Sequence, residues 1–244
     1  MKNVIILLVA ILFSAGMAFA QSNQATVVQN DDGNEAFVEQ VGINHTATVT
    51  QTSDEGLAKQ QGHFANIEQL GLEGIGSGDN NTATVVQDRG WATASHTANI
   101  YQWGNDNVAD VEQIHPGYNV ATITQDGIGN FAGIFQEYWN EFNATQTGDD
   151  NTIEGVPGAG IYGFEDVAFQ RSVGFSSLGY VMNFTQYGDN NLIQAGQERG
   201  TGTSTIIQSG DWNTALSYQN NGVNDVINIT QTGYENDAVV TQNR

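Results

Sequence analysis

The chain of 244 residues contains no cysteine, only two prolines and only six Lys and Arg residues. Without cysteine no disulfide can hold the fold, so the stabilising contacts must be distributed along the chain. Two prolines beside 29 glycines do not match a Pro-rich disordered chain, and frequent turns between short strands fit better. The 27 acidic residues give a formal charge of −21. This charge argues against a nucleic-acid partner, which would require clustered Lys and Arg.

The sequence has a single long apolar run, VIILLVAILF at residues 4–13, which follows Lys2 and precedes small residues ending at Ala20. A charged start, a short apolar run and an A-x-A end are the layout of a secretory signal peptide. The run is too short to cross a bilayer. We therefore expect residues 1–20 to be a signal peptide cleaved before Gln21, and the mature chain to be exported and not embedded in a membrane.

An internal repeat dominates the rest of the sequence. The motif Q-x-G-x-x-N-x-A-x-x-x-Q is formed by Gln102, Gly104, Asn107, Ala109 and Gln113. Further copies, one with Ile in place of Ala and one with Ile and without the final Gln, begin at Gln125, Gln146, Gln186, Gln208 and Gln231. Successive copies are separated by 23, 21, 40, 22 and 23 residues, so the period is close to 22.

Between these copies lies a looser segment with the pattern N-x-A-x-I-x-Q, as in Asn119–Gln125. The same pattern, with His in place of Asn in three cases, occurs at residues 23–29, 34–40, 45–51, 63–69, 81–87 and 96–102. The whole chain then contains about eighteen strand-like segments, or about nine units of two segments each.

Within each segment the repeated residues alternate with variable ones. Asn107, Ala109, Val111 and Gln113 share one face, and this period of two predicts a strand. The intervening G-x-x-N tolerates positive φ and predicts a tight turn. Residues 21–244 are therefore expected to form one all-β domain, a β-solenoid of about nine strand–turn–strand repeats with two facing, parallel, in-register sheets.

A buried amide without a partner is costly, but amides that recur in every coil can bond to their copies above and below. Such a ladder fixes the register, because a slip of one residue would turn the inner face outward. The residues predicted to form this core and to mediate self-assembly are Gln29, Gln40, Gln51, Gln69, Gln87, Gln102, Asn107, Gln113, Asn119, Gln125, Asn130, Gln136, Gln146, Asn151, Gln186, Asn191, Gln197, Gln208, Asn213, Gln219, Gln231, Asn236 and Gln242.

Two regions depart from the pattern. Residues 152–185 place Pro157 at a Gln position and Tyr180 at an Asn position, so we expect a distorted coil or an extruded loop there. Residues 71–78 are rich in glycine and predict an inserted turn within a regular unit.

Other chemistry is less well supported by the sequence. His45, His63 and His96 stand at the Asn position of the motif, and we expect corner residues rather than metal ligands, because their spacing matches no zinc signature. The acids of turns such as Asp149–Asn151 are expected to be solvated rather than to bind Ca²⁺, because the nonapeptide of calcium-binding β-rolls is absent. No metal and no cofactor are therefore expected.

Outward residue pairs and turn residues offer two further possibilities. The pair Thr48 and Thr50 resembles the T-x-T arrays of ice-binding solenoids, but only a minority of strands carry it. Trp103, Trp139 and Trp212 lie in or beside turns and favour either a glycan or partner surface, or local packing. No catalytic triad, nucleophile elbow or tuned pair of carboxylates stands out, so we expect no catalytic residues and no enzyme activity.

The repeated Q-x-G-x-x-N-x-A-x-x-x-Q, behind an expected signal peptide in an acidic, cysteine-free chain, resembles the curlin repeat of curli-type functional amyloid fibres. The resemblance covers nearly all of residues 23–242. It implies a secreted subunit that polymerises with copies of itself into fibres of the biofilm matrix, with roles in adhesion and surface colonisation. It also implies a nucleator subunit and an outer-membrane export machinery as partners. Two differences are that the repeats begin at Asn23, without a Gly-rich secretion segment, and that they are more numerous than is usual in the family.

Three alternatives remain open at this point. The chain could be the minor, nucleator subunit of the same fibre, although Arg244 is the only basic residue near its C-terminal end, which favours the major subunit. It could instead be a monomeric secreted solenoid that binds glycan, ice or Ca²⁺ through one face. A solenoid enzyme acting on polysaccharide is the third.

Overall fold

The computed structural model describes residues 22–30, 33–52, 62–71, 79–88, 95–115, 117–155, 168–171, 179–220 and 223–243. The expected signal peptide and most of the glycine-rich insertion at 71–78 lie outside these ranges. Every regular element of the described residues is a strand. None of them belongs to a helix that is long and apolar enough to cross a membrane.

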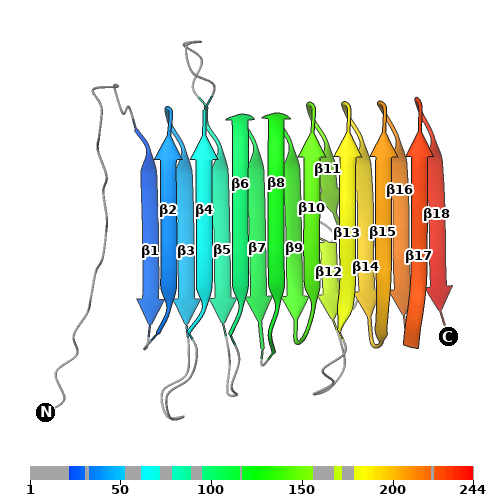
Figure 1. The fold of residues 1–244 in the computed structure, drawn as a ribbon, viewed down its shortest axis with the longest axis horizontal. Helices are drawn as coiled ribbons and strands as arrows, with labels where there is room; N and C mark the ends of the chain where they lie inside the picture. Colours follow the sequence, from blue (N-terminus) through cyan, green and yellow to red (C-terminus); the bar gives the residue numbers. More distant parts are fainter. Residues whose placement is uncertain are drawn as a thin grey trace, which may run out of the picture.

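The strands form two flat sheets that lie face to face (Figure 1). The ten-stranded sheet consists of β1 (Gln24–Asn30), β3 (Thr46–Thr52), β5 (Thr82–Asp88), β7 (Val108–Ile114), β9 (Phe131–Glu137), β11 (Thr152–Glu154), β12 (Ala168–Arg171), β14 (Leu192–Glu198), β16 (Thr214–Asn220) and β18 (Asp237–Asn243). The eight-stranded sheet consists of β2 (Glu35–Val41), β4 (Phe64–Leu70), β6 (Thr97–Asn105), β8 (Val120–Ile128), β10 (Glu141–Thr147), β13 (Tyr180–Tyr187), β15 (Thr201–Ser209) and β17 (Val223–Thr232).

When β11 and β12 are counted as one strand, consecutive strands alternate between the two sheets, and each inner strand pairs in parallel with the strand two places before it and two places after it. The chain therefore coils from one end of the molecule to the other, with β1 at one end and β18 at the other (Figure 1). This arrangement confirms the predicted β-solenoid with two parallel, in-register sheets.

The register follows the repeat along the whole molecule. In the ten-stranded sheet Ala47 pairs with Ala83, Ala83 with Ala109, and Ala109 with Ala132. A shift occurs between Thr201 and Gly202, at the start of β15. Because the side-chain period of a strand is two, this constant register keeps the same residue type facing inward in every coil.

One position in the ten-stranded sheet is divided between two short strands. β11 pairs with the first part of β9 and β14, and β12 pairs with their second part. Gln170 in β12 is in register with Gln136 and Gln197, so Gln170 occupies the position that the sequence spacing assigned to Pro157. The assignment of Pro157 was wrong because an insertion, residues 155–167, separates the two halves of this strand, and counting along the chain does not skip it. Pro157 lies outside the described residues.

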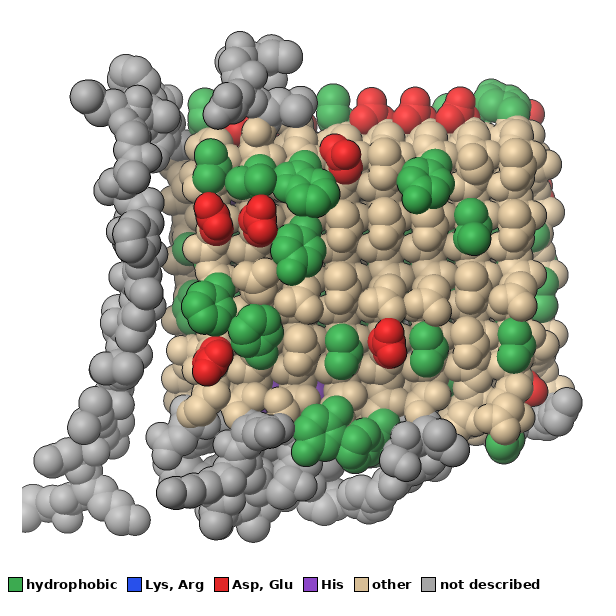
Figure 2. All heavy atoms as spheres, viewed as in Figure 1, with side chains coloured by type: hydrophobic (Ala, Val, Ile, Leu, Met, Phe, Trp, Pro, Cys, Tyr) green, Lys and Arg blue, Asp and Glu red, His purple; other side chains and the backbone are tan. Residues whose placement is uncertain are grey.

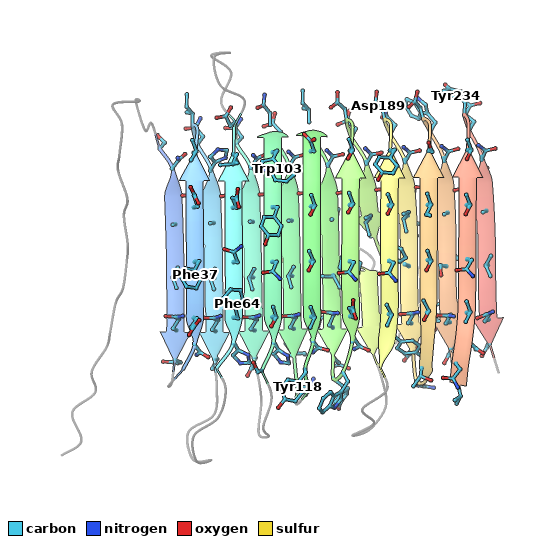
Figure 3. The ribbon with its side chains drawn as sticks, in the orientation of Figure 1. Phe37, Phe64, Trp103, Tyr118, Asp189 and Tyr234 are labelled. Atoms are coloured by element: carbon cyan, nitrogen blue, oxygen red, sulfur yellow. The ribbon has the colours of Figure 1, made fainter. Side chains whose placement is uncertain are left out.

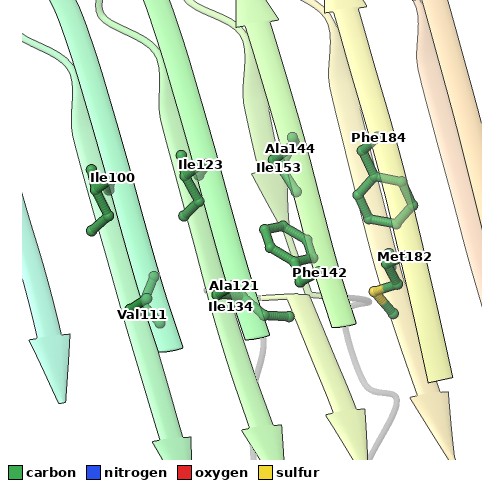
Figure 4. Packing of buried hydrophobic residues seen from close by; sticks show 14 of the residues in the cluster. Ile100, Val111, Ala121, Ile123, Ile134, Phe142, Ala144, Ile153, Met182 and Phe184 are labelled. Carbon is green, nitrogen blue, oxygen red and sulfur yellow. The ribbon is translucent and has the colours of Figure 1, made fainter. Parts of the chain in front are cut away.

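In most strands the core between the sheets contains one small and one larger apolar residue; among the exceptions are Ile227 and Ile229 in β17 and the buried Ser204 and Ser217. Ala121 and Ile123 of β8, like Val111 of β7, are fully buried (Figure 4). Where Phe142 replaces the small residue in β10, Ala144 replaces the branched one, so the total volume is nearly kept. The rings of Phe142 and Phe184 meet edge to face at 5.9 Å. The core is therefore continuous along the solenoid, and each coil adds a thin layer to it.

Tight turns connect most strands of the eight-stranded sheet to the next coil; residues 72–78, between β4 and β5, lie outside the described residues. Gly104 has φ of +98° and Asp106 has φ of +55°, and the equivalent glycines Gly127, Gly148, Gly188 and Gly210 also have positive φ. A Cβ added to Gly148 would lie 2.3 Å from the carbonyl oxygen of Gly188 in the next coil. The glycine of the motif is therefore required both by the backbone conformation and by the close approach of successive turns.

Candidate self-assembly site

The inward glutamines form two ladders, one in each sheet. In each ladder the Nε2 of a glutamine donates to the Oε1 of the glutamine one coil further toward the C-terminal end. In the eight-stranded sheet the bonds are 2.8–3.0 Å and join Gln40, Gln69, Gln102, Gln125, Gln146, Gln186, Gln208 and Gln231 in that order.

The ladder of the ten-stranded sheet has the same direction. Bonds of 2.7–2.9 Å join Gln29, Gln51, Gln87, Gln113 and Gln136. Beyond the divided strand, Gln197 donates to Gln219, and Gln219 donates to Gln242. Both ladders thus have donors that point to the C-terminal end and acceptors that point to the N-terminal end.

Each glutamine also bonds across the core to the strand that precedes it in sequence. Gln125 Nε2 donates to the backbone carbonyl of Val108 in β7 at 3.0 Å, and Gln113 Nε2 donates to that of Thr97 in β6 at 3.0 Å. The acceptor lies five residues before the glutamine of that preceding strand, as Val108 does before Gln113; at the divided strand, Gln186 Nε2 donates instead to the carbonyl of Thr152 in β11. The amides therefore join successive coils within a sheet and also join the two sheets.

A ladder of asparagines follows the tight-turn corner. The Oδ1 of Asn107 accepts bonds of 3.1 Å from the backbone N–H and from the Nδ2 of Asn130 in the next coil. Asn107 Nδ2 in turn donates to the carbonyl of Gly127 at 3.0 Å. The same bonds recur at Asn130, Asn151, Asn191, Asn213 and Asn236. These asparagines fix each turn to the turn of the neighbouring coil.

The three histidines are buried at corner positions, as the sequence suggested, and they perform the acceptor role of asparagine. His45 Nδ1 accepts the backbone N–H of Asn81 at 3.3 Å, and its Nε2 lies 3.0 Å from the Val41 carbonyl. Since a backbone N–H can only donate and a carbonyl can only accept, His45 is neutral with its proton on Nε2. Burial lowers the pKa of His45, against the opposing effects of the Val41 carbonyl and the Asp79 carboxylate.

The rings of His63 and His96 are stacked at 4.9 Å, and His63 Nδ1 accepts the backbone N–H of His96 at 3.1 Å. In the part of the chain that the structure describes, no three His, Asp or Glu side chains gather in a way that would hold a metal ion.

The acids of the tight turns form hydrogen bonds along one edge of the solenoid. Asp149 Oδ1 accepts the N–H of Ile128 at 2.9 Å, and Asp189 Oδ1 accepts the N–H of Asp149 at 2.9 Å. Asp189 lies at this edge in Figure 3. The carboxylates thus bind backbone donors of the preceding coil, which is a structural role that the sequence analysis did not predict.

Aromatic side chains gather on the outer face of the eight-stranded sheet near the N-terminal end. Phe37 and Phe64 lie with ring centroids 5.8 Å apart, and Trp103 is 37% exposed (Figures 2 and 3). On the edge of the solenoid opposite the tight turns, the rings of Tyr118 and Trp139 pack with their centroids 4.7 Å apart. The outward threonines form no uniform array, because the column that contains Thr48 and Thr84 continues with an aspartate in β7.

The predicted ladder residues occupy the inner face and the corners. Those in the middle of the molecule are buried, whereas Gln29 is exposed and Gln40, Asn236 and Gln242 are half-buried, because they lie in the terminal coils. Sequence analysis missed Gln170, whose signal is the tripeptide FQR at 169–171 beside FQE at 135–137. Corner residues at the same positions as the predicted asparagines but not included in that set are Asn23, Asn34, Asn81 and Asn140.

The two ends of the solenoid expose strand edges and incomplete ladders. Among the described residues, no amide donates to Gln29 Oε1 or Gln40 Oε1 at the N-terminal end. At the C-terminal end, Gln242 Nε2 donates to the Val226 carbonyl at 3.1 Å, and within the described residues no further glutamine follows it. An exposed strand edge with unpaired backbone groups is a template for another strand.

A comparison with protein families supports the identity of this repeat. Residues 20–52, which include β1, β2 and β3, match the family described as curlin associated repeat. No curated protein matches the chain. The same spacing of Asn, Ala and Gln recurs in the later coils. The start of this solenoid is thus similar to a curlin repeat, and the resemblance of the chain to the curlin-repeat family is confirmed.

Proposed function

We propose that this protein is a secreted structural subunit that assembles head to tail into extracellular cross-β fibres of the curli type. The observation that carries the proposal is the pair of glutamine ladders, which end in unused acceptors at one end of the solenoid and in donors at the other. The two ends are complementary and lie on opposite sides of the molecule, so their association gives open growth and not a closed dimer.

Several further features of the proposed role come from the resemblance to curlins. The fibres would lie at the cell surface and contribute to the biofilm matrix, adhesion and surface colonisation. A nucleator subunit and an outer-membrane export machinery would be the partners, and this chain would be the major subunit. The ladder glutamines and asparagines would be assembly residues, and the chain would have no catalytic role. Cleavage before Gln21 would be seen directly in the mass of the secreted protein.

The test begins with the chain, lacking residues 1–20, in denaturant. After the denaturant is removed, thioflavin fluorescence should rise over hours to days, and fibre diffraction should show a meridional reflection near 4.7 Å. A chain that stays folded and monomeric at tens of micromolar would contradict the proposal.

A matched pair of variants at the last strand sharpens this test. Val240 faces the core and is partly buried, whereas its neighbour Val239 faces outward and is 72% exposed. Val240→Glu places a charge on the inner face of the C-terminal end and should slow fibre elongation at least tenfold. Val239→Glu adds the same charge outside and should have a much smaller effect. Equal slowing by both variants would point to net charge rather than to the end surface.

A monomeric solenoid that binds glycan is the second candidate function, and the outward aromatic group of exposed Phe37 and Trp103 and half-buried Phe64 favours it. Aromatic rings on a flat face are suited to stacking against sugar rings. Binding of soluble polysaccharide by a chain that remains monomeric, and loss of that binding in Trp103→Ala, would support this candidate in place of the fibre subunit.

A further inference from the structure

The two sheets contain unequal numbers of strand positions. β11 and β12 share one position, so the ten-stranded sheet has nine positions and the eight-stranded sheet has eight. The first described strand, β1, and the last, β18, both belong to the sheet with nine positions. The described solenoid is therefore half a coil longer on one side than on the other.

The hydrogen bonds of the glutamines follow a rule that depends on strand order and not on which sheet the strand belongs to. Gln208 in β15 donates to Gln231 in β17, two strands later in the chain. It also donates to the carbonyl of Leu192 in β14, one strand earlier. Gln219 likewise donates to Gln242 and to the Thr203 carbonyl. Both sheets use the same rule because their strands carry the same Gln at the same place.

When this rule is continued past β18, the next strand to be added pairs with the free edge of β17 in the eight-stranded sheet. The strand after that pairs with the free edge of β18 in the ten-stranded sheet. The first two strands of a second copy are β1 and β2, so Gln231 would donate to Gln29 of the next copy, and Gln242 would donate to Gln40 of the next copy. Gln29 of that copy would then donate to the Asp237 carbonyl, which is five residues before Gln242.

We infer that successive subunits of the fibre are rotated by half a turn about the fibre axis, so that the ten-stranded sheet of one copy continues the eight-stranded sheet of the next. This inference rests on the proposed function and specifies the partner surface: β17 and β18 bind β1 and β2 of a second copy. The half-turn reverses the strand direction of an added copy, and β1 therefore remains parallel to β17.

Stacking without rotation is disfavoured by the unequal sheets. If β1 of the next copy lay on β18, its β2 would be two coils away from β17, and one strand position would be empty. The backbone donors and acceptors on the edge of β17 would then stay unpaired above the buried side chains Ile227 and Ile229. The half-turn fills this position with β1.

The turn lengths at the joint also agree with the half-turn. Gln29 and Asn34, which flank the link between β1 and β2, are five residues apart, and so are Gln231 and Asn236, which flank the link between β17 and β18. The spacing between the flanking residues is therefore the same on both sides of the joint, so the same register can continue. One contact opposes the arrangement: Asp237 would lie beside Glu35 of the next copy, but both are exposed, so their repulsion is weak.

Disulfide trapping distinguishes the two arrangements, and the native chain contributes no cysteine to confuse the result. Partners in register on adjacent strands are close enough for a disulfide. The half-turn pairs Asn228 with Thr26 of the next copy and Val239 with Phe37 of the next copy; stacking without rotation pairs Val239 with Thr26. All four side chains are exposed on outer faces. Within one molecule, β1 and β2 are at the opposite end from β17 and β18 (Figure 1), so these disulfides can form only between copies.

Three double variants are assembled under reducing conditions, and the fibres are oxidised and separated on non-reducing gels. The half-turn predicts covalent dimers and longer oligomers from Thr26→Cys with Asn228→Cys, and from Phe37→Cys with Val239→Cys. Thr26→Cys with Val239→Cys should remain monomeric on the gel. The opposite pattern, with fibres present, would overturn the half-turn and leave the fibre proposal standing. Absence of fibres from the native chain would instead contradict the proposed function itself.

If a double variant does not assemble, the single variants are assembled as a mixture of the two. Thr26→Cys mixed with Asn228→Cys should give dimers only, because each chain then carries one reactive end. Dimers from the mixture of Thr26→Cys with Val239→Cys and not from the first mixture would again contradict the half-turn.

Discussion

A buried glutamine in the middle of the solenoid satisfies its amide with partners in three strands. Gln125 accepts from Gln102, donates to Gln146, and donates to the carbonyl of Val108. Such a residue would be a liability in a single copy, because an unpaired buried amide costs about 1–3 kcal/mol. Repetition supplies the partners, so the amides specify the register that the apolar core alone would leave less sharply defined.

Gln125→Leu should destabilise the solenoid by about 2 kcal/mol, because it leaves the amide of Gln102 without its acceptor and the Oε1 of Gln146 without its donor. The midpoint of dissociation of fibres in guanidinium measures this effect. The control is Thr124→Leu, which adds a similar apolar side chain on the outer face next to it. Equal midpoints for the two variants would contradict a stabilising role of the ladder.

His45→Asn should make stability less sensitive to acid. Burial lowers the pKa of His45 below its ordinary value of 6.5. As pH falls, His45 of the unfolded chain therefore takes up a proton before His45 of the folded chain does. The stability that neutral His45 contributes is present above pH 6.5 and is lost as the pH falls below it. Asn is the residue that the motif uses at this position, and its Oδ1 accepts the same N–H without titrating.

Guanidinium dissociation at about pH 7.5 and about pH 5.5 measures the sensitivity conferred by His45. The native chain should lose more stability between these two conditions than His45→Asn does. The carboxylates are identical in the two proteins, so their contribution cancels in the comparison. An equal loss in both proteins would contradict the prediction.

At the scale of the element, a strand and its tight turn depend on each other. The turn is tight only if its glycine can adopt positive φ, and only if the absence of a Cβ lets the next turn approach. Gly148 illustrates both requirements, with φ of +111° and a carbonyl of the next coil where a Cβ would be. On the other edge the turn lengths vary: His63 follows Gln51 by twelve positions, and Asn140 follows Gln136 by four.

Gly148→Ala should destabilise the folded chain by about 3 kcal/mol, at the upper end of single-site effects, because both the conformation and the contact with Gly188 are unfavourable for alanine. Gly233→Ala is the matched control. It has a similar φ of +113°, but the nearest atom to its Cβ would be Asn236 Nδ2 at 3.6 Å, since no coil follows.

The two variants therefore separate folding from growth. In the soluble chain before assembly, circular dichroism should show slower or incomplete formation of strands in Gly148→Ala and a nearly native signal in Gly233→Ala. Seeded elongation should be slow in both, because a second copy must approach Gly233. Normal elongation of Gly233→Ala would show that the last turn is not part of the joint.

At the scale of the whole molecule, the formal charge of −21 opposes association while the ladders favour it. Like charges also face each other within the solenoid, as in the in-register pair Glu39 and Glu68 on the outer face of the eight-stranded sheet. In the proposed fibre subunit this balance would delay assembly without preventing it, which would suit a chain that leaves the cell before it polymerises.

Raising NaCl from about 0.02 M to about 0.3 M should shorten the lag of assembly severalfold, because the Debye length falls below the spacing between subunits' charges. The double variant Glu39→Gln with Glu68→Gln should have a shorter lag at low salt and a smaller response to salt. Thioflavin fluorescence against time measures both quantities. A lag that does not change with salt would mean that repulsion does not limit assembly.

The repeat in the sequence determined the strands, their alternation between two sheets and the inward amides. These features are local or periodic: the spacing from Gln102 to Gln113 contains the strand, the turn and the positions that must be paired. What failed was counting across the irregular unit, where Pro157 was assigned the place of Gln170. An insertion changes the count along the chain but not the register in space, because register is set by hydrogen bonds to the neighbouring strands.

By itself, then, the sequence determined the class of fold, the residues of the core and the resemblance to curlin repeats, because nearly every coil repeats the same pattern of Gln, Asn and small apolar residues. Only the tertiary structure decided the direction of the amide ladders, the acceptor role of the histidines, the aspartate bonds along the turn edge and the unequal lengths of the two sheets. These properties depend on which coil is above and which is below. A periodic pattern read along the chain is the same in every coil and does not contain that information.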